Sequence, residues 1–182
     1  FASIVNFNEY YQQRGETEES YRVLNRIVSK FDSLLDLPHF QSVEKIKTIG
    51  STYMAASGLN LPRGGQSSVD HLVTLIDFAI QLEEVLKTIN SQTVGFAFSL
   101  RVGFNYGSVT SGVVGRRKML YDIWGDVVNV ASRMETTGQK GRIQMPEQCL
   151  TLLSPYIVHL GSRTVQVKGK GDMRTLFIAR RS

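Results

Sequence analysis

The chain is organised around the stretch Leu120-Tyr121-Asp122-Ile123-Trp124-Gly125-Asp126-Val127-Val128-Asn129-Val130-Ala131-Ser132-Arg133-Met134. This stretch predicts a short apolar strand, a glycine turn and a helix. In its helical part, apolar side chains recur at the i, i+3, i+4, i+7 spacing of one buried face. Asn129 and Arg133 are four residues apart, so they share a face roughly opposite the apolar one. Gly125 allows the backbone to turn, and Asp126 is predicted to cap the helix.

This stretch displays a carboxylate, an amide and a guanidinium near one turn, from Asp122, Asn129 and Arg133. An ordinary solvated helix face explains such a pattern in most proteins, because polar helix faces usually meet water. The rest of the chain decides between that interpretation and a binding site.

Length and composition indicate one globular domain, residues 1–182, with 42% hydrophobic and 20% charged residues. No apolar run approaches the ~18 residues that span a bilayer, and no signal peptide is present. The first five residues, Phe1-Ala2-Ser3-Ile4-Val5, read as a strand already under way. We therefore expect the sequence to be a piece of a longer protein.

Charge and cysteine content exclude two classes of protein. The single cysteine, Cys149, forms no internal disulfide, which fits a reducing compartment. The net charge of +5 is small and scattered, without the stripe of basic and aromatic residues typical of nucleic-acid binding. No nucleic-acid partner is therefore expected.

Hydrophobic periodicity predicts the order of the elements. Strands are expected at 1–7, 43–49, 52–57, 96–105, 109–114, 120–124, 142–145, 156–167 and 173–180, helices at 17–36, 69–89, 126–134 and 146–153, and a flexible loop at 60–68. The long elements run strand, helix, strand, strand, helix, strand, followed by a mixed tail. This order predicts an α+β, ferredoxin-like fold: an antiparallel sheet with its helices on one face, plus a C-terminal mixed α/β extension.

General catalytic motifs do not assign a reaction. The sequence has no nucleophile elbow, no Walker lysine loop and no zinc-ligand spacing. The three histidines occur in unrelated contexts, so they are interpreted as structural or exposed. Polar residues remain at the ends of elements, among them Lys47 before a hairpin turn and Lys168 in a glycine-rich turn.

Five blocks of sequence, in order, resemble the class III nucleotide cyclases. They lie at 1–7, 44–56, 100–103, 121–134 and 167–171. More narrowly, they resemble the second cytoplasmic catalytic domain (C2) of animal membrane adenylyl cyclases. The resemblance implies a fragment of a longer membrane protein. The domain would lie at the cytoplasmic face of the plasma membrane and pair head to tail with a homologous first domain (C1).

The resemblance also implies where the metal ions are bound. In this family the first domain supplies two aspartates for two Mg²⁺ or Mn²⁺ ions. Here Ser3 and Ser51 occupy those positions, and a hydroxyl is a poor substitute for the carboxylate that Mg²⁺ prefers. We expect no metal site in this domain, both ions in a C1-type partner, and an isolated domain that is inactive even as a homodimer.

Substrate-binding roles follow residue by residue from the resemblance. Lys47 and Asp122, with Ile123 beside it, match the purine-reading positions, where guanylyl cyclases carry Glu and Cys, so ATP is the expected substrate. Asn129 is implied to position the ribose. Arg133 is implied to stabilise the α-phosphoryl group in the transition state, and Lys168 to meet the β- and γ-phosphates.

Two regulatory sites are implied as well. Phe1, Ala2, Ile49, Gly50 and Ser51 match one wall of a pocket for diterpene activators. Tyr21 stands where many relatives have leucine, and its larger ring counts against diterpene binding.

The helix that follows Thr17 and the loop before Phe96 match a groove for the stimulatory G-protein α subunit. In that loop, Gly95-Phe96-Ala97 departs from the usual Phe-Asn-Asp pattern.

Two other interpretations compete with that of a domain forming half of an adenylyl cyclase site. One is a catalytically silent, regulatory cyclase-fold module, which differs only in its partner. The other is an RNA-binding ferredoxin-like domain, which requires exposed aromatic residues on the sheet. The aromatic residues of the predicted strands instead follow the alternation of a buried core.

Overall fold

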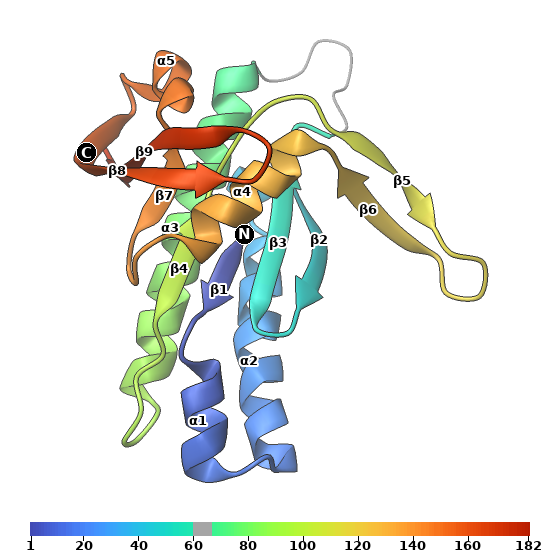
Figure 1. The fold of residues 1–182 in the computed structure, drawn as a ribbon. Helices are drawn as coiled ribbons and strands as arrows, with labels where there is room; N and C mark the ends of the chain where they lie inside the picture. Colours follow the sequence, from blue (N-terminus) through green and yellow to red (C-terminus); the bar gives the residue numbers. More distant parts are fainter. Residues whose placement is uncertain (60–66) are drawn as a thin grey trace.

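The computed structural model describes residues 1–59 and 67–182, so most of the loop expected at 60–68 lies outside the described residues (Figure 1). The helices are α1 (Phe7–Arg14), α2 (Glu18–Leu34), η1 (Pro38–Phe40), α3 (Ser68–Ser91), α4 (Asp126–Thr136), η2 (Glu147–Cys149) and α5 (Leu150–Leu153). The strands are β1 (Ala2–Ile4), β2 (Val43–Ile49), β3 (Thr52–Ser57), β4 (Leu100–Gly103), β5 (Thr110–Val114), β6 (Leu120–Trp124), β7 (Ile143–Pro146), β8 (Ile157–Val167) and β9 (Gly171–Arg180). No described helix is both long and apolar enough to cross a bilayer.

Seven strands form one sheet in the order β2-β3-β1-β4-β7-β9-β8. Its first four strands are antiparallel and follow the ferredoxin-like order, so the predicted fold class is confirmed. β7, β9 and β8 extend the sheet beyond β4, with β7 parallel to β4. β5 and β6 form a separate hairpin that projects from the body of the molecule (Figure 1).

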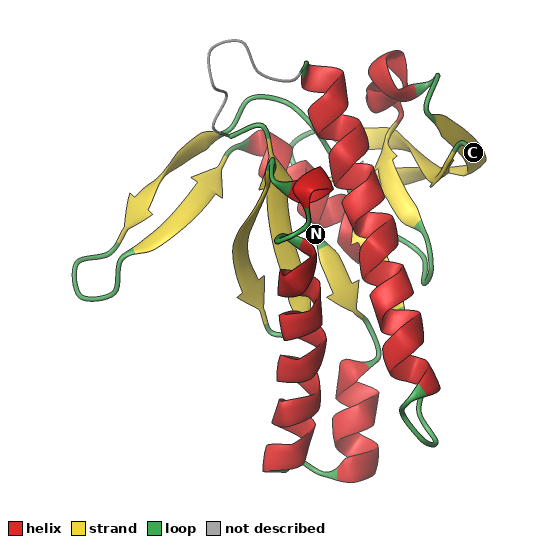
Figure 2. Ribbon diagram, turned by 180° about the vertical axis from the view of Figure 1, so that it is seen from behind, coloured by secondary structure: helices red, strands yellow, loops and turns green. Residues whose placement is uncertain are grey.

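The two faces of the sheet carry different helices. α1, α2 and α3 cover one face, and α4 crosses the other (Figures 1 and 2). The alternation of β4 matches this arrangement, because Leu100 and Val102 enter the core beneath α3 while Arg101 meets α4. The Arg101 guanidinium lies 2.8 Å from the buried carboxylate of Glu135 on α4. The second, smaller core beneath α4 contains Val130 and Met134, as their spacing predicted.

Three expected elements differ in extent from those observed. The strand expected at 96–105 pairs only over β4, because the Phe98 and Ser99 amides donate to the side-chain oxygens of Asn90 and Asn6 instead of a neighbouring strand. The strand expected at 1–7 gives way to α1 at Phe7, and the helix expected at 146–153 begins as the 3-10 turn η2. Gly125, not Asp126, is the N-cap of α4, since its φ of 135° suits glycine.

Replacement of Gly103 by alanine is expected to destabilise the fold by about 1–3 kcal/mol, the cost of overpacking a core. A Cβ atom there would lie 2.0 Å from the Glu135 nitrogen and 2.4 Å from the Ala131 carbonyl oxygen, so α4 would have to move. Thermal or urea unfolding measures the effect. Gly161→Ala is the matched control, because its added Cβ meets only the Phe177 ring, at 3.9 Å. Equal stability of the two variants would contradict the close packing of α4.

Candidate functional site

Lys47 and Asp122 come from distant strands and meet above the sheet. Lys47 of β2 donates from Nζ to Oδ2 of Asp122 on β6 at 2.8 Å. The other oxygen of Asp122 accepts the backbone amide of Ile123 at 2.9 Å. The hydrogen bond from Lys47, together with that amide, lowers the pKa of the Asp122 carboxyl against a smaller opposing effect of burial. At neutral pH the pair is therefore an ammonium beside a carboxylate, both partly open to solvent.

Asn129 and Arg133 project from the exposed face of α4, while Ile123 is buried at 7% exposure. Arg133 donates its Nε–H to the carbonyl oxygen of Gln166 on β8 at 3.0 Å. This bond fixes the side chain by one edge of its planar guanidinium. Within residues 1–59 and 67–182, the terminal nitrogens make no hydrogen bond or ion pair, so they remain available as donors.

Lys168 lies in the turn between β8 and β9, two residues beyond Gln166, and is exposed. The same turn is tied to the start of α4, since Lys170 Nζ lies 2.6 Å from Oδ2 of Asp126. Asp126, predicted to cap α4, thus anchors the turn instead. The expected phosphate-binding residues therefore come from α4 and a turn held against it. The sequence did not reveal Gln166 or Lys170 as partners, because both contacts join segments that are distant in the chain.

The positions expected to lack metal ligands are occupied by hydroxyls already bonded to the chain. Ser3 and Thr52 share a hydrogen bond of 2.6 Å between their hydroxyl oxygens, and Ser51 Oγ donates to the Ile4 carbonyl oxygen at 3.1 Å. In residues 1–59 and 67–182, no three His, Cys, Asp or Glu side chains gather as potential metal ligands. These residues do not fit a pair of Mg²⁺ or Mn²⁺ ions, whose preferred ligands are carboxylates.

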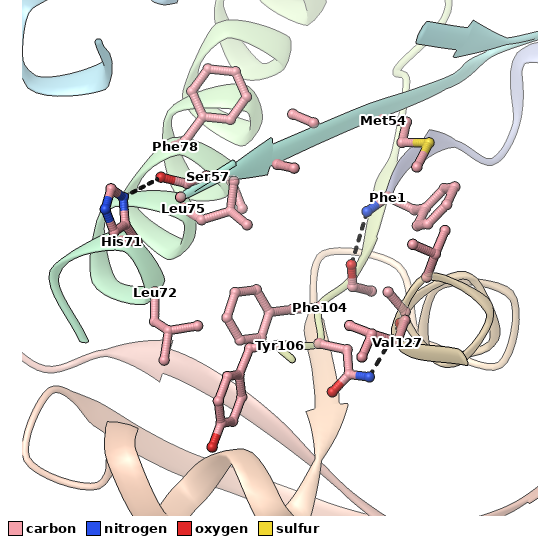
Figure 3. A pocket seen from close by; sticks show the side chains of 18 of the residues that line it. Phe1, Met54, Ser57, His71, Leu72, Leu75, Phe78, Phe104, Tyr106 and Val127 are labelled. Carbon is pink, nitrogen blue, oxygen red and sulfur yellow. Dashed lines mark hydrogen bonds between the residues drawn. The ribbon is translucent and has the colours of Figure 1, made fainter. Parts of the chain in front are cut away.

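A cavity of about 590 Å³ opens between α3, β3 and α4, and it is distinct from this polar site (Figure 3). Phe1, Ala2 and Ile123 line it. The five polar residues expected to bind the nucleotide do not: Lys47, Asp122, Asn129, Arg133 and Lys168. Most of its wall is apolar, with a Ser57–His71 hydrogen bond of 3.0 Å at one end. Its described lining contains no lysine or arginine for the charge of a triphosphate.

The residues expected in an activator pocket do not share one cavity in this chain. Phe1 and Ala2 line the cavity of Figure 3, whereas Ile49 and Gly50 lie at the β2–β3 turn, outside it. Tyr21 is 60% exposed on α2, and its ring centroid lies 5.6 Å from that of Tyr11. The activator pocket remains a prediction for the paired domains.

Hydrogen bonds join the two parts of the surface expected to receive a G protein. Arg14 at the end of α1 donates to the carbonyl oxygen of Val94 at 2.8 Å, and Arg26 of α2 hydrogen-bonds the Gln92 side chain. These contacts hold the segment that precedes Phe96 beside α1 and α2. Val94, in this segment, is 87% exposed.

Known sequences identify the family. The profile described as "Adenylate and Guanylate cyclase catalytic domain" matches residues 1–180. Similar curated proteins include adenylate cyclase type 9 from Gallus gallus and from Xenopus laevis, each 51% identical over 179 residues. These matches cover 96% of this chain but only 13% and 14% of the two relatives, so the chain spans a small part of their length.

A solved structure agrees with the family match. The guanylate cyclase domain of RhGC from Catenaria anguillulae, in complex with GTP, superposes with a TM-score of 0.80 at 28% identity. The superposition covers 100% of this chain and 94% of that one. The resemblance to class III nucleotide cyclases is thus confirmed, and the chain belongs to the family of adenylate and guanylate cyclase catalytic domains.

Proposed function

We propose that this domain is a C2-type half of an adenylyl cyclase site, which converts ATP to 3′,5′-cyclic AMP and pyrophosphate when paired with a C1-type domain. The observation that carries the proposal is the 2.8 Å bond between Lys47 and Asp122, which places an ammonium and a carboxylate side by side. The similarity to adenylate cyclase type 9 supports the same activity.

The paired groups match the edge of adenine. Adenine N1 accepts a hydrogen bond and its N6 amino group donates one. Lys47 has three N–H donors, so it donates to N1 while it holds Asp122, and Asp122 accepts from N6. Guanine carries an N1–H donor and an O6 acceptor, so the same pair would leave buried groups unpaired, which costs about 1–3 kcal/mol for each group.

The phosphate end uses the residues of α4 and the β8–β9 turn. Asn129 positions the ribose so that its 3′ oxygen attacks the α-phosphorus, and the bond to the β-phosphate oxygen breaks as pyrophosphate leaves. Arg133, held at Nε by Gln166, directs its terminal nitrogens at the negative charge that develops on the α-phosphoryl oxygens. Lys168 attracts the β- and γ-phosphates. All of these roles are electrostatic or positional.

Exposed apolar side chains support a partner domain. Six of them lie on the β2–β3 turn and the projecting β5–β6 hairpin, at 40–72% exposure: Ile49, Val113, Val114, Met119, Leu120 and Trp124. Exposed apolar patches of this kind mark interaction surfaces. Because Ser3 and Ser51 supply no carboxylates, the partner is the source of the aspartates for two Mg²⁺ or Mn²⁺ ions.

Mixing this domain with a C1-type domain that carries the two aspartates is expected to produce cyclic AMP from ATP with Mg²⁺ or Mn²⁺. The domain alone, including any homodimer, is expected to be nearly inactive, since it lacks metal carboxylates. A cyclase assay with and without the partner measures this. Strong activity of the domain alone would contradict the division of roles. Pairing without turnover would favour the alternative, a catalytically silent regulatory module.

Further partners belong to the same proposal. The surface formed by α2 and the segment before Phe96 is the site for a stimulatory G-protein α subunit, supported by the contacts that hold these parts together. The parent protein places the domain at the cytoplasmic face of the plasma membrane. A diterpene activator would bind between the paired domains, and the exposed Tyr21 ring disfavours it.

A further inference from the structure

Strand β2 contains an irregularity just before Lys47. Lys45 pairs with Ala55 of β3, but Lys47 pairs with Met54, so the register shifts by one residue at Ile46. In a regular strand, residues 45 and 47 would point to the same face of the sheet. The extra residue reverses this relation, because a bulge turns the following side chains to the opposite face.

The two lysines accordingly contact different layers of the molecule. Lys45 points to the helical layer, where its Nζ lies 2.8 Å from Oδ2 of Asp32 on α2 and 5.3 Å from the centre of the Tyr53 ring. Lys47 points to the other face and meets Asp122. Without the bulge, a strand anchored at Lys45 would carry Lys47 into the helical layer, away from Asp122.

Asp32 binds both strands of the hairpin at once. Its Oδ1 accepts the hydroxyl of Tyr53 on β3 at 2.8 Å while Oδ2 accepts Lys45 on β2. Burial and the bond to Asp32 raise the pKa of Tyr53, so its hydroxyl remains a proton donor. Lys45 and Tyr53 lie on either side of the register shift, so the carboxylate clamps the residues that define the bulge.

We propose that Asp32, Lys45 and Tyr53 are positioning residues for nucleotide selection: they fix the bulge at Ile46 and thereby aim Lys47 at Asp122. This inference deepens the proposed function, on which its consequence for ATP rests. None of the three touches the nucleotide edge itself. The purine-reading pair is thus controlled from the opposite face of the sheet, through a residue of α2.

Titration of Asp122 tests the geometry without any partner or activity. In Asp32→Ala, the pKa of the Asp122 carboxyl is expected to rise toward its ordinary value, because Lys47 is no longer held in hydrogen-bonding position. NMR of labelled aspartate measures this pKa. Loss of a negative charge by itself would lower the pKa of another carboxyl. The sign of the change therefore separates loss of position from loss of charge.

Two further variants serve as controls. Asp36→Ala removes an exposed carboxylate just beyond α2 and is expected not to raise the pKa of Asp122. Deletion of Ile46 gives a regular ladder in which Lys45 and Lys47 keep their present faces. In that background Asp32→Ala should no longer raise the pKa of Asp122. An equal rise in both backgrounds would contradict the role of the bulge.

Nucleotide selection tests the consequence. With a C1-type partner, Asp32→Ala is expected to lower the preference for ATP over GTP about tenfold, equal to roughly 1.4 kcal/mol, through KM and not kcat. If the pKa of Asp122 stays the same or falls in Asp32→Ala, the inference is wrong, whatever the activity. If that pKa rises and the preference for ATP does not change, the positioning stands and the proposed purine role of Lys47 and Asp122 fails.

Discussion

Arg133→Ala is expected to raise the activation free energy of the paired enzyme by about 2.7–4 kcal/mol, which lowers kcat roughly 10²–10³-fold. This is the range for loss of one donor to a transition-state oxyanion. The affinity for ATP should change little, because the guanidinium acts on charge that develops only during the reaction. Steady-state kinetics with a C1-type partner give kcat, and equilibrium binding of a non-reactive ATP analogue gives the affinity.

The contacts of Arg133 allow an effect on catalysis to be separated from an effect on folding. The Arg133 side chain is exposed, and in the described part of the chain its only hydrogen bond is to the Gln166 carbonyl oxygen, so its removal should leave the fold intact. Arg163→Ala is the matched control, because Arg163 also holds α4, through the Thr137 carbonyl oxygen at 2.8 Å, but lies away from Asn129. A large loss of affinity with unchanged kcat in Arg133→Ala would show that Arg133 binds the ground state.

The double variant Lys47→Glu, Asp122→Cys is expected to convert the purine preference from ATP toward GTP. A glutamate accepts from guanine N1–H, and a cysteine no longer presents a carboxylate to O6. Sites that hydrogen-bond their substrate discriminate by as much as ~10⁴-fold, so the change in the ratio of kcat/KM values should be large. Competing assays with both nucleotides and a C1-type partner measure that ratio.

Single variants give the control for this exchange. Lys47→Glu alone places two carboxylates where an ammonium and a carboxylate now lie 2.8 Å apart, so it should impair both nucleotides. Asp122→Cys alone leaves Lys47 without its partner. Recovery of GTP use only in the double variant would show that the two residues act as a pair. An unchanged preference for ATP in the double variant would refute the purine role.

Local sequence was sufficient for most elements, because their signals lie within a few residues. The spacing of apolar residues in α4 and the charged first turn of α2 predicted both helices nearly to the residue. The hairpin of β2 and β3 was predicted with its observed bounds. The strand at 96–105 was predicted too long, because the sequence does not show that Asn6 and Asn90 would satisfy its backbone amides.

The sequence by itself determined which functional groups are available: two lysines, a carboxylate, an amide and an arginine at the ends of elements, and two serines at the positions where the resemblance implies metal-binding aspartates in the first domain. Only the tertiary structure decided which of these meet. Lys47 and Asp122 are 75 residues apart in the chain, and they touch because a bulge at Ile46 turns one lysine of β2 toward β6 and leaves the other on α2. A one-residue register shift changes the face of every side chain beyond it. Local propensity does not encode that shift, so the direction in which the Lys47 side chain points depends on packing across the whole sheet.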